Sequence, residues 1–265
     1  MAGDRWTERD LVLERYAKSA SRGTTIYEFR SPERDWAGYA LDWIDWNPTW
    51  TAVDAGCGLG AYFPALRRRV PAGVLIGIDV TLVELEHTAA LQPGVPLAGA
   101  DVQAVPLREA SVDAIVCAHM LYHVPDVAAA LREFRRVLRP GGTFLAIYDS
   151  EVDDQCELDD LFMASGGTVP LNRLTARFSI ESGPGYLEPV FDDVVLHTER
   201  PAMLVPEVDP VTSEIDGLRA VAEPYLEPGV TWDGMLARAA ERVVEVIERD
   251  GVFRISEHKG VFVCR

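Results

Sequence analysis

A glycine-rich segment, residues 53–60 with the sequence VDAGCGLG, limits most strongly what this chain of 265 residues can fold into. It lies between a short apolar run and a stretch with helical spacing. Glycine lets the backbone approach a ligand closely, and the first turn of the following helix offers N–H groups that have no partner within the helix. The segment therefore predicts a strand, a ligand-binding loop and a helix, in that order.

The same alternation of strand and helix signals continues from residue 48 to residue 150. Four short apolar segments rich in Val and Ile have the pattern of strands covered on both faces, and they are Thr51–Ala55, Val74–Asp79, Val112–Ala118 and Thr143–Tyr148. Three further segments are expected to be helices: Tyr62–Arg69, Leu82–Leu91 and Val127–Leu138, the last with a stop signal at residues 140–142. Repeated β-α-β units imply an α/β fold with a mostly parallel sheet and helices on both faces.

The regions on either side of this core are expected to complete a single domain over residues 1–265. Residues 1–47 are interpreted as an N-terminal helical cap, with a helix that starts at Ser31 as N-cap and Pro32 as its first residue. The C-terminal part, residues 151–265, is expected to hold an insertion at 151–185, a strand at 193–200, a helical roof at 207–250 and extended chain at the end. The acidic run at residues 151–160 is interpreted as a solvated face.

Two classes of ligand fit the glycine-rich loop. Asp79 ends the next strand, 23 residues after Gly56, where a carboxylate can accept hydrogen bonds from both hydroxyls of a ribose. The loop fits the looser fingerprint of dinucleotide sites, Gly-x-Gly-x-x-Ala, and it also fits a site for S-adenosylmethionine. Two carboxylates favour the second class. Asp54 stands where dinucleotide folds usually place a small or apolar residue, and Asp101 can accept from an adenine amino group.

The order and spacing of five motifs carry a more specific interpretation. They are VDAGCGLG, GIDV, GADVQAVPL, SVDAIVCAHMLYHVPD and LREFRRVLRPGG. From Val53 to Ile147 the chain resembles the core of class I S-adenosylmethionine-dependent methyltransferases, in the small-molecule branch that is similar to the enzymes of ubiquinone and menaquinone biosynthesis. The resemblance implies a Rossmann-like fold with a mostly parallel seven-stranded sheet. It also implies S-adenosyl-L-methionine as cofactor and S-adenosyl-L-homocysteine as product.

The resemblance assigns roles to residues around the cofactor. Gly56, Cys57 and Gly58 would wrap its methionine and ribose portions, and Asp79 would bind the ribose hydroxyls. The other candidates are Val80 against adenine, Asp101 and Val102 at the adenine edge, Ala118 and His119 on the methionine side, and Arg30, 26 residues before Gly56, paired with the cofactor carboxylate. Asp54 is also a candidate for cofactor contact, although it could instead hydrogen-bond amides of the loop.

Methyl transfer requires alignment of the nucleophile, the methyl carbon and the sulfur, and a protonated nucleophile also requires a base. The catalytic candidates are His119, Tyr122 and His123, which follow the expected strand that ends at Ala118. Histidine titrates near neutral pH, and His123 is the first candidate for the base, with helix capping or loop packing as its alternative role. No metal site is expected, because the glutamate of the HExxH pattern and a third ligand are lacking.

Net charge and composition disfavour several classes of function. The formal net charge of −17 disfavours nucleic acid and anionic membrane surfaces as partners. The chain has no run of about 18 apolar residues, no signal-peptide pattern and no CxxC pair, so we expect a cytoplasmic enzyme that acts on a small organic acceptor. The alternatives are a cofactor-binding protein without transferase activity and an NAD-dependent oxidoreductase. Neither the acceptor nor the oligomeric state follows from the sequence.

Overall fold

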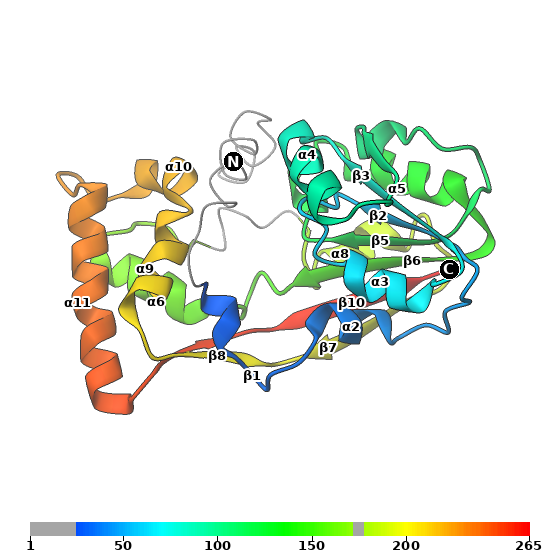
Figure 1. The fold of residues 1–265 in the computed structure, drawn as a ribbon. Coiled ribbons are helices and arrows are strands. Elements are labelled where there is room, and N and C mark those ends of the chain that lie inside the picture. Colours follow the sequence, from blue (N-terminus) through cyan, green and yellow to red (C-terminus); the bar gives the residue numbers. More distant parts are fainter. Residues whose placement is uncertain (1–24, 172–177) are drawn as a thin grey trace. The chain divides into compact units, whose positions relative to one another are not determined.

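The computed structural model describes residues 25–171 and 178–265, which form two compact units (Figure 1). Of the described residues, the sheet unit consists of 35–148, 178–198 and 260–265, and the helical unit consists of 25–34, 149–171 and 199–259. Each unit is built from three separate segments of the chain. The units therefore do not coincide with the expected cap, core and C-terminal part, which follow one another along the sequence. Residues 1–24 of the expected cap lie outside the described residues.

Seven strands form one sheet in the order β4-β3-β2-β5-β6-β10-β7. Their bounds are Thr51–Ala55 (β2), Val74–Asp79 (β3), Leu97–Gly99 (β4), Val112–Ala118 (β5), Leu138–Asp149 (β6), Val194–Glu199 (β7) and Lys259–Cys264 (β10). The strands β4, β3, β2, β5 and β6 pair in parallel, and Val53 of β2 lies opposite Ile76 on β3 and Ile115 on β5. The mostly parallel seven-stranded sheet of an α/β fold is therefore confirmed.

Alternating side chains bury both faces of this sheet. On β6, Leu145 and Ile147 belong to one hydrophobic cluster, and Phe144, Ala146 and Tyr148 belong to the other. The first cluster includes residues of the helices α2 (Trp36–Leu41), α3 (Phe63–Arg69) and α4 (Leu82–Leu91), and the second includes residues of α5 (Val127–Val137) and α8 (Gly183–Leu187). Helices thus cover both faces, which leaves the carboxyl edge of the parallel strands for a ligand.

The first helix of the sheet unit does not start where the sequence signal places it. It begins at Trp36 rather than after Ser31, because Asp35 is its N-cap and accepts a hydrogen bond from the Gly38 amide (2.9 Å). Ser31 instead pairs with Ala202 in a short antiparallel strand. The local cap signal therefore yields to strand pairing with a distant segment.

The expected stop signal at residues 140–142 lies inside a strand. The helix α5 ends at Val137, and β6 begins at Leu138 and pairs with Val112 of β5. Proline prevents the helix from continuing, but the chain returns to the sheet directly and needs no loop after the Pro-Gly-Gly sequence.

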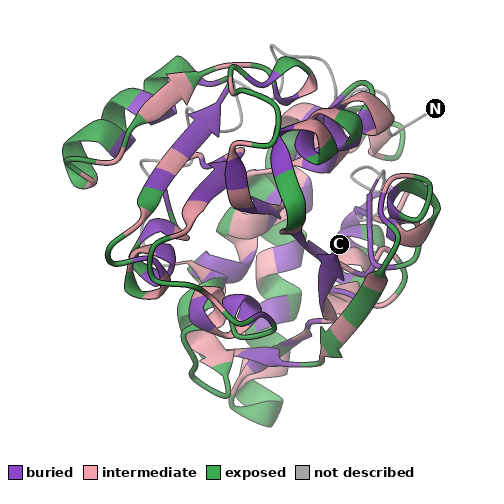
Figure 2. Ribbon diagram, turned by 90° about the vertical axis from the view of Figure 1, so that its right-hand side faces the viewer, coloured by how far each residue is buried: buried purple, intermediate pink, exposed green. Residues whose placement is uncertain are grey.

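The helical unit combines a three-stranded antiparallel sheet with helices. The sheet has the order β1-β8-β9, and its strands are Arg30–Ser31 (β1), Ala202–Val205 (β8) and Phe253–Ser256 (β9). The helices include α6 (Cys156–Ser165), α9 (Val208–Asp216), α10 (Arg219–Ala222) and α11 (Trp232–Asp250). Buried residues recur every three or four positions on α11, and Figure 2 shows such buried and exposed sides on the helices. In the described ranges no helix is long and apolar enough to cross a bilayer.

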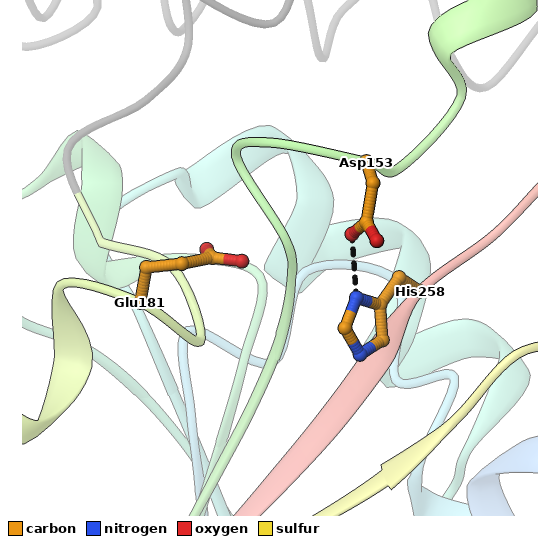
Figure 3. Close-up of side chains that lie close together, drawn as sticks. All are labelled: Asp153, Glu181 and His258. Atoms are coloured by element: carbon orange, nitrogen blue, oxygen red, sulfur yellow. Dashed lines mark hydrogen bonds and ion pairs between the residues drawn. The ribbon is translucent and has the colours of Figure 1, made fainter.

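The acidic run is not a solvated face throughout, which corrects the expectation from sequence. Asp154 is buried and accepts from the backbone amide of His258 (2.7 Å). Glu157 accepts from the amide and the hydroxyl of Ser256 (2.9 and 2.6 Å). Figure 3 shows Asp153 beside His258, with 2.5 Å between Oδ1 and Nδ1. The turn after β9 therefore uses these acids as hydrogen-bond acceptors.

A buried ion-pair network lies at the same turn. Lys259 Nζ lies 2.8 Å from Asp149 Oδ1 and 2.9 Å from Glu257 Oε1, and Arg30 donates two hydrogen bonds of 2.5 and 2.7 Å to Glu257. The Glu257 side chain is fully buried. Burial acts to lower the pKa of Lys259, but the charges of Asp149, Asp154 and Glu257 outweigh it and raise this pKa well above its usual value. The lysine therefore stays charged.

Lys259→Met should lower the free energy of unfolding by about 3–5 kcal/mol, because the removal of one partner of a buried ion pair leaves the carboxylates uncompensated. Chemical denaturation at pH 7 measures the difference. The control is Arg249→Ala, which removes an exposed ion pair with Asp250 on α11 and should leave the midpoint unchanged. Equal effects of the two variants would contradict a stabilising role of the network.

Candidate functional site

The glycine-rich loop leaves the carboxyl end of β2 in a conformation that requires glycine. Gly56 and Gly58 have φ values of +73° and +47°, in the left-handed region that side chains disfavour. The amides of Gly56 and Cys57 donate to the carbonyl of Ile78 on β3 (2.7 and 3.0 Å). The loop is therefore tied to the neighbouring strand before the chain enters α3.

Asp79, the last residue of β3, binds the loop through its side chain. Its Oδ2 accepts from the Gly58 amide (2.9 Å), and its Oδ1 accepts from the Thr81 amide (2.8 Å). The hydroxyl of Thr88 on α4 donates to the Gly58 carbonyl (2.7 Å). Each carboxylate oxygen has a second lone pair. Asp79 can therefore accept from ligand hydroxyls while it positions the loop.

Three carboxyl groups converge on Cys57. Burial raises the pKa of the Cys57 thiol well above its usual value, and the charges of Asp54, Asp79 and Glu84 raise it further. The thiol stays protonated and packs as a small apolar group. Glu84, in the first turn of α4, was missed in the sequence analysis. The signal that could have revealed it is its position one helical turn before Thr88, on the same side of α4.

Two of these carboxyls have strongly raised pKa values. Burial raises the pKa of Asp54 and that of Glu84 to about 7 in each case, and the charge of Asp79 contributes to both. Asp54 is 2% exposed, and its Oδ2 has no hydrogen-bond partner in the described part of the chain. A buried carboxyl oxygen without a donor is unfavourable. The site therefore fits a ligand that brings a donor or a positive charge to the loop.

The residues expected around adenine follow β3 and β4. Val80 is 37% exposed, whereas Val102 is buried. The Asp101 carboxylate accepts from the backbone amide of Gln103 (2.8 Å) and from its side-chain nitrogen (3.0 and 3.1 Å). Asp101 is exposed, so its remaining lone pairs are accessible to a ligand.

The segment after β5 lies against the glycine-rich loop. A side chain at Gly56 would begin 2.5 Å from Met120 Cγ, so Met120 occupies space that only glycine leaves open. His119 has a φ of +52°, and its amide donates to the Ile147 carbonyl (3.1 Å). Ala118 and His119 are both partly buried. The structure thus brings the ends of β2 and β5 together, as the roles expected for Ala118 and His119 require.

The hydroxyl of Tyr148, another residue missed in the sequence analysis, holds this segment in place. Tyr148 is fully buried on β6, and its oxygen accepts from the amides of Met120 and Leu121 (3.2 and 2.7 Å). Because two amides donate to this oxygen, its own proton is directed to the Cys117 sulfur at 3.4 Å. Burial raises the pKa of Tyr148 well above its usual value, so the phenol keeps that proton.

The three catalytic candidates lie on this segment. Tyr122 and His123 belong to a short 3-10 helix, and their ring centroids are 4.4 Å apart. The Tyr148 ring lies 6.0 Å from the rings of both His119 and Tyr122. All three candidates are partly buried. Two imidazoles and a phenol at the carboxyl end of β5 can accept or donate a proton there.

Arg30 belongs to the helical unit, whereas all other candidates for cofactor contact belong to the sheet unit. Its guanidinium binds Glu257 and lies over the Tyr27 ring, with 5.3 Å between Cζ and the ring centroid. Its expected contact with the cofactor carboxylate stays a prediction.

Comparison with known sequences finds similar proteins for the core of the sheet unit. Residues 53–146 match the family described as methyltransferase domain. The demethylmenaquinone methyltransferase of Roseiflexus castenholzii is 40% identical over 95 residues, which are 35% of this chain and 40% of that protein. That of Staphylococcus aureus is 35% identical over 145 residues, which are 53% of this chain and 59% of that protein. The chain thus spans about half the length of the curated relatives it matches.

Comparison with solved structures identifies the fold. A crystal structure from Bacillus halodurans, of a protein with a provisional methyltransferase name, has a TM-score of 0.59 at 15% sequence identity. The matched region covers 86% of this chain and 97% of the chain in that crystal structure. At this identity the similarity shows the fold alone, which is the Rossmann-like fold expected from the sequence.

Tyr148→Phe should lower the free energy of unfolding by about 1–3 kcal/mol, because it leaves the amides of Met120 and Leu121 without a buried acceptor. Thermal and chemical denaturation measure the change. Tyr186→Phe is the matched control, since Tyr186 is 37% exposed and contacts Phe178 through its ring. If both variants were equally stable, the hydrogen bonds assigned to the Tyr148 hydroxyl would be wrong.

Proposed function

We propose that the protein transfers a methyl group from S-adenosyl-L-methionine to a small organic acceptor, because residues 53–146 match the family described as methyltransferase domain. The observation that carries the proposal is the hydrogen bond from the Gly58 amide to Asp79, which leaves lone pairs for ligand hydroxyls. The unpartnered Asp54 oxygen supports a ligand with positive charge. S-adenosyl-L-methionine combines ribose hydroxyls with a sulfonium and an ammonium group, and its product is S-adenosyl-L-homocysteine.

The residues of the loop and of the strand ends are proposed to bind and orient the cofactor. When bound, its sulfonium supplies an electrophilic methyl group. Asp79 accepts from the ribose hydroxyls, and Arg30 pairs with the cofactor carboxylate. The further contacts proposed are Asp54, Gly56, Cys57 and Gly58 along methionine and ribose, Val80, Asp101 and Val102 around adenine, and Ala118 and His119 on the methionine side.

His123 is the proposed general base for the acceptor, and His119 and Tyr122 are the next candidates. The carboxyl end of β5 positions all three. A neutral imidazole can take the proton that a hydroxyl, an amine or an acidic carbon loses on methylation. The protein otherwise contributes alignment of the nucleophile with the methyl carbon.

The acceptor is proposed to be a small molecule of natural-product or other small-molecule metabolism in the cytoplasm. The net charge of −17 opposes a nucleic-acid substrate, and no metal is proposed for the reaction. Neither alternative, an NAD-dependent oxidoreductase or a binding protein without transferase activity, receives support from the relatives or from the similar structure.

Binding and turnover test this proposal separately. Titration calorimetry should detect S-adenosyl-L-methionine and no binding of NAD. A screen of small hydroxyl, amine and carbon-acid acceptors should then yield S-adenosyl-L-homocysteine. Tighter binding of NAD would overturn the proposal, and cofactor binding without turnover on any acceptor would favour the binding protein.

Asp79→Ala should weaken binding of S-adenosyl-L-methionine by about 1.5–3 kcal/mol, the scale of a lost charge-assisted hydrogen bond. Asp101→Ala should have a smaller effect, because this carboxylate is assigned to one amino group. Calorimetry on both variants gives the comparison. Normal affinity of the Asp79 variant would show that the ribose role is wrongly assigned.

His123→Ala should lower the rate of methyl transfer about 10²–10⁴-fold with little change in cofactor affinity, because the imidazole is assigned to the acceptor. The acidic limb of the pH–rate profile, near the histidine pKa of about 6.5, should disappear. Single-turnover kinetics with saturating cofactor measure both effects. A normal rate with an unchanged profile would remove His123 from the catalytic candidates and direct the test to Tyr122 and His119.

A further inference from the structure

We propose that Asp54 and Glu84 make the cofactor site respond to the charge on sulfur, so that the sulfonium donor gains affinity as pH rises and releases more protons on binding than the thioether product does. The inference rests on the proposed function and states what the same site discriminates. S-adenosyl-L-methionine and S-adenosyl-L-homocysteine share their nucleoside and amino-acid groups. They differ in the methyl group and in the positive charge on sulfur.

Both carboxyls lie against the glycine-rich loop. Asp54 stands on β2 two residues before Gly56, and Glu84 Oε2 lies 3.3 Å from the point where a side chain of Gly58 would begin. The charges of both carboxyls raise the pKa of the Cys57 thiol, and Cys57 lies between Gly56 and Gly58 in the loop. Asp54 is 2% exposed and Glu84 is 6% exposed. Two buried carboxyls therefore flank the backbone that is proposed to wrap the donor.

These carboxyls have no cationic partner among the residues that the structure describes. The charged group that acts on both is another carboxyl, that of Asp79. The other titratable groups close to Asp54 are the thiols of Cys57 and Cys117, and its Oδ2 accepts no hydrogen bond. Such a group of buried acids either takes up protons or receives a cation.

Protonation and ligand charge are therefore coupled. With pKa values of about 7, both carboxyls are partly protonated in the free protein at neutral pH. A positive charge nearby favours the carboxylate form, so it lowers both pKa values and releases protons. By linkage, affinity for the cation increases as pH rises through the lowered pKa values toward 7 and becomes constant above about 8. The product keeps the ammonium group but lacks the sulfonium charge, so its affinity should rise less with pH.

Titration calorimetry of the full chain with each ligand at pH 6, 7 and 8 tests the inference. S-adenosyl-L-methionine should bind about tenfold more tightly at pH 8 than at pH 6, whereas S-adenosyl-L-homocysteine should change less than about twofold. The same titrations in two buffers of different ionisation enthalpy count the protons. Proton release should accompany the methyl donor and be smaller for the product.

Glu84→Gln keeps the shape of the side chain and removes its charge. It should weaken binding of the donor about three- to tenfold at pH 8, weaken binding of the product less, and reduce the proton release. Glu86→Gln is the matched control, because Glu86 is exposed on the same helix, and it should change none of these quantities. Asp54→Asn provides a second variant with the same expected direction, and circular dichroism checks that each variant is folded.

Several outcomes would overturn the inference while the proposed function stands. They are an affinity for S-adenosyl-L-methionine that is constant from pH 6 to pH 8, an equal rise for the product, or equal effects of Glu84→Gln and Glu86→Gln. Absence of donor binding to the folded wild-type protein at pH 8 would instead overturn the proposed function, and the inference with it.

Discussion

The hydrogen bond from the Gly58 amide to the Asp79 carboxylate is the interaction on which the site depends. It joins the loop after β2 to the end of β3, so the loop keeps one conformation although glycine could adopt many. The amides of Gly56 and Cys57 reinforce this link through the Ile78 carbonyl. A carboxylate that positions the loop and retains lone pairs can serve the fold and a ligand at once.

Burial of both sheet faces explains why the chemistry gathers at one edge. Helices and side chains of alternating strand positions fill both faces with apolar contacts, so a ligand can reach the sheet where the parallel strands end. Tyr148 shows how this edge is built, because its buried hydroxyl accepts the amides of Met120 and Leu121 just after β5 leaves the sheet. The segment with His119, Tyr122 and His123 is therefore held by a residue of the neighbouring strand.

Buried carboxyl groups have different charged neighbours in the two units. In the helical unit Glu257 is fully buried and has two cationic partners, Arg30 and Lys259, so its charge is compensated. In the sheet unit Asp54 and Glu84 are buried with another carboxyl as their charged neighbour, and their pKa values rise to about 7. Perturbed carboxyls that a fold leaves uncompensated are typical of functional sites, which agrees with the position of the glycine-rich loop between them.

The sequence alone determined the strands β2, β3 and β5, the glycine-rich loop and the place of Asp79, because each follows from a local pattern of apolar residues and glycines. Only the tertiary structure decided that Asp35 caps the first helix, that the acidic run binds the turn after β9, and that Glu84 and Tyr148 contact the site. The physical reason is that the local sequence around a polar residue does not show which group its side chain will contact. Whether it faces solvent, a backbone amide or a ligand depends on which distant segment packs beside it.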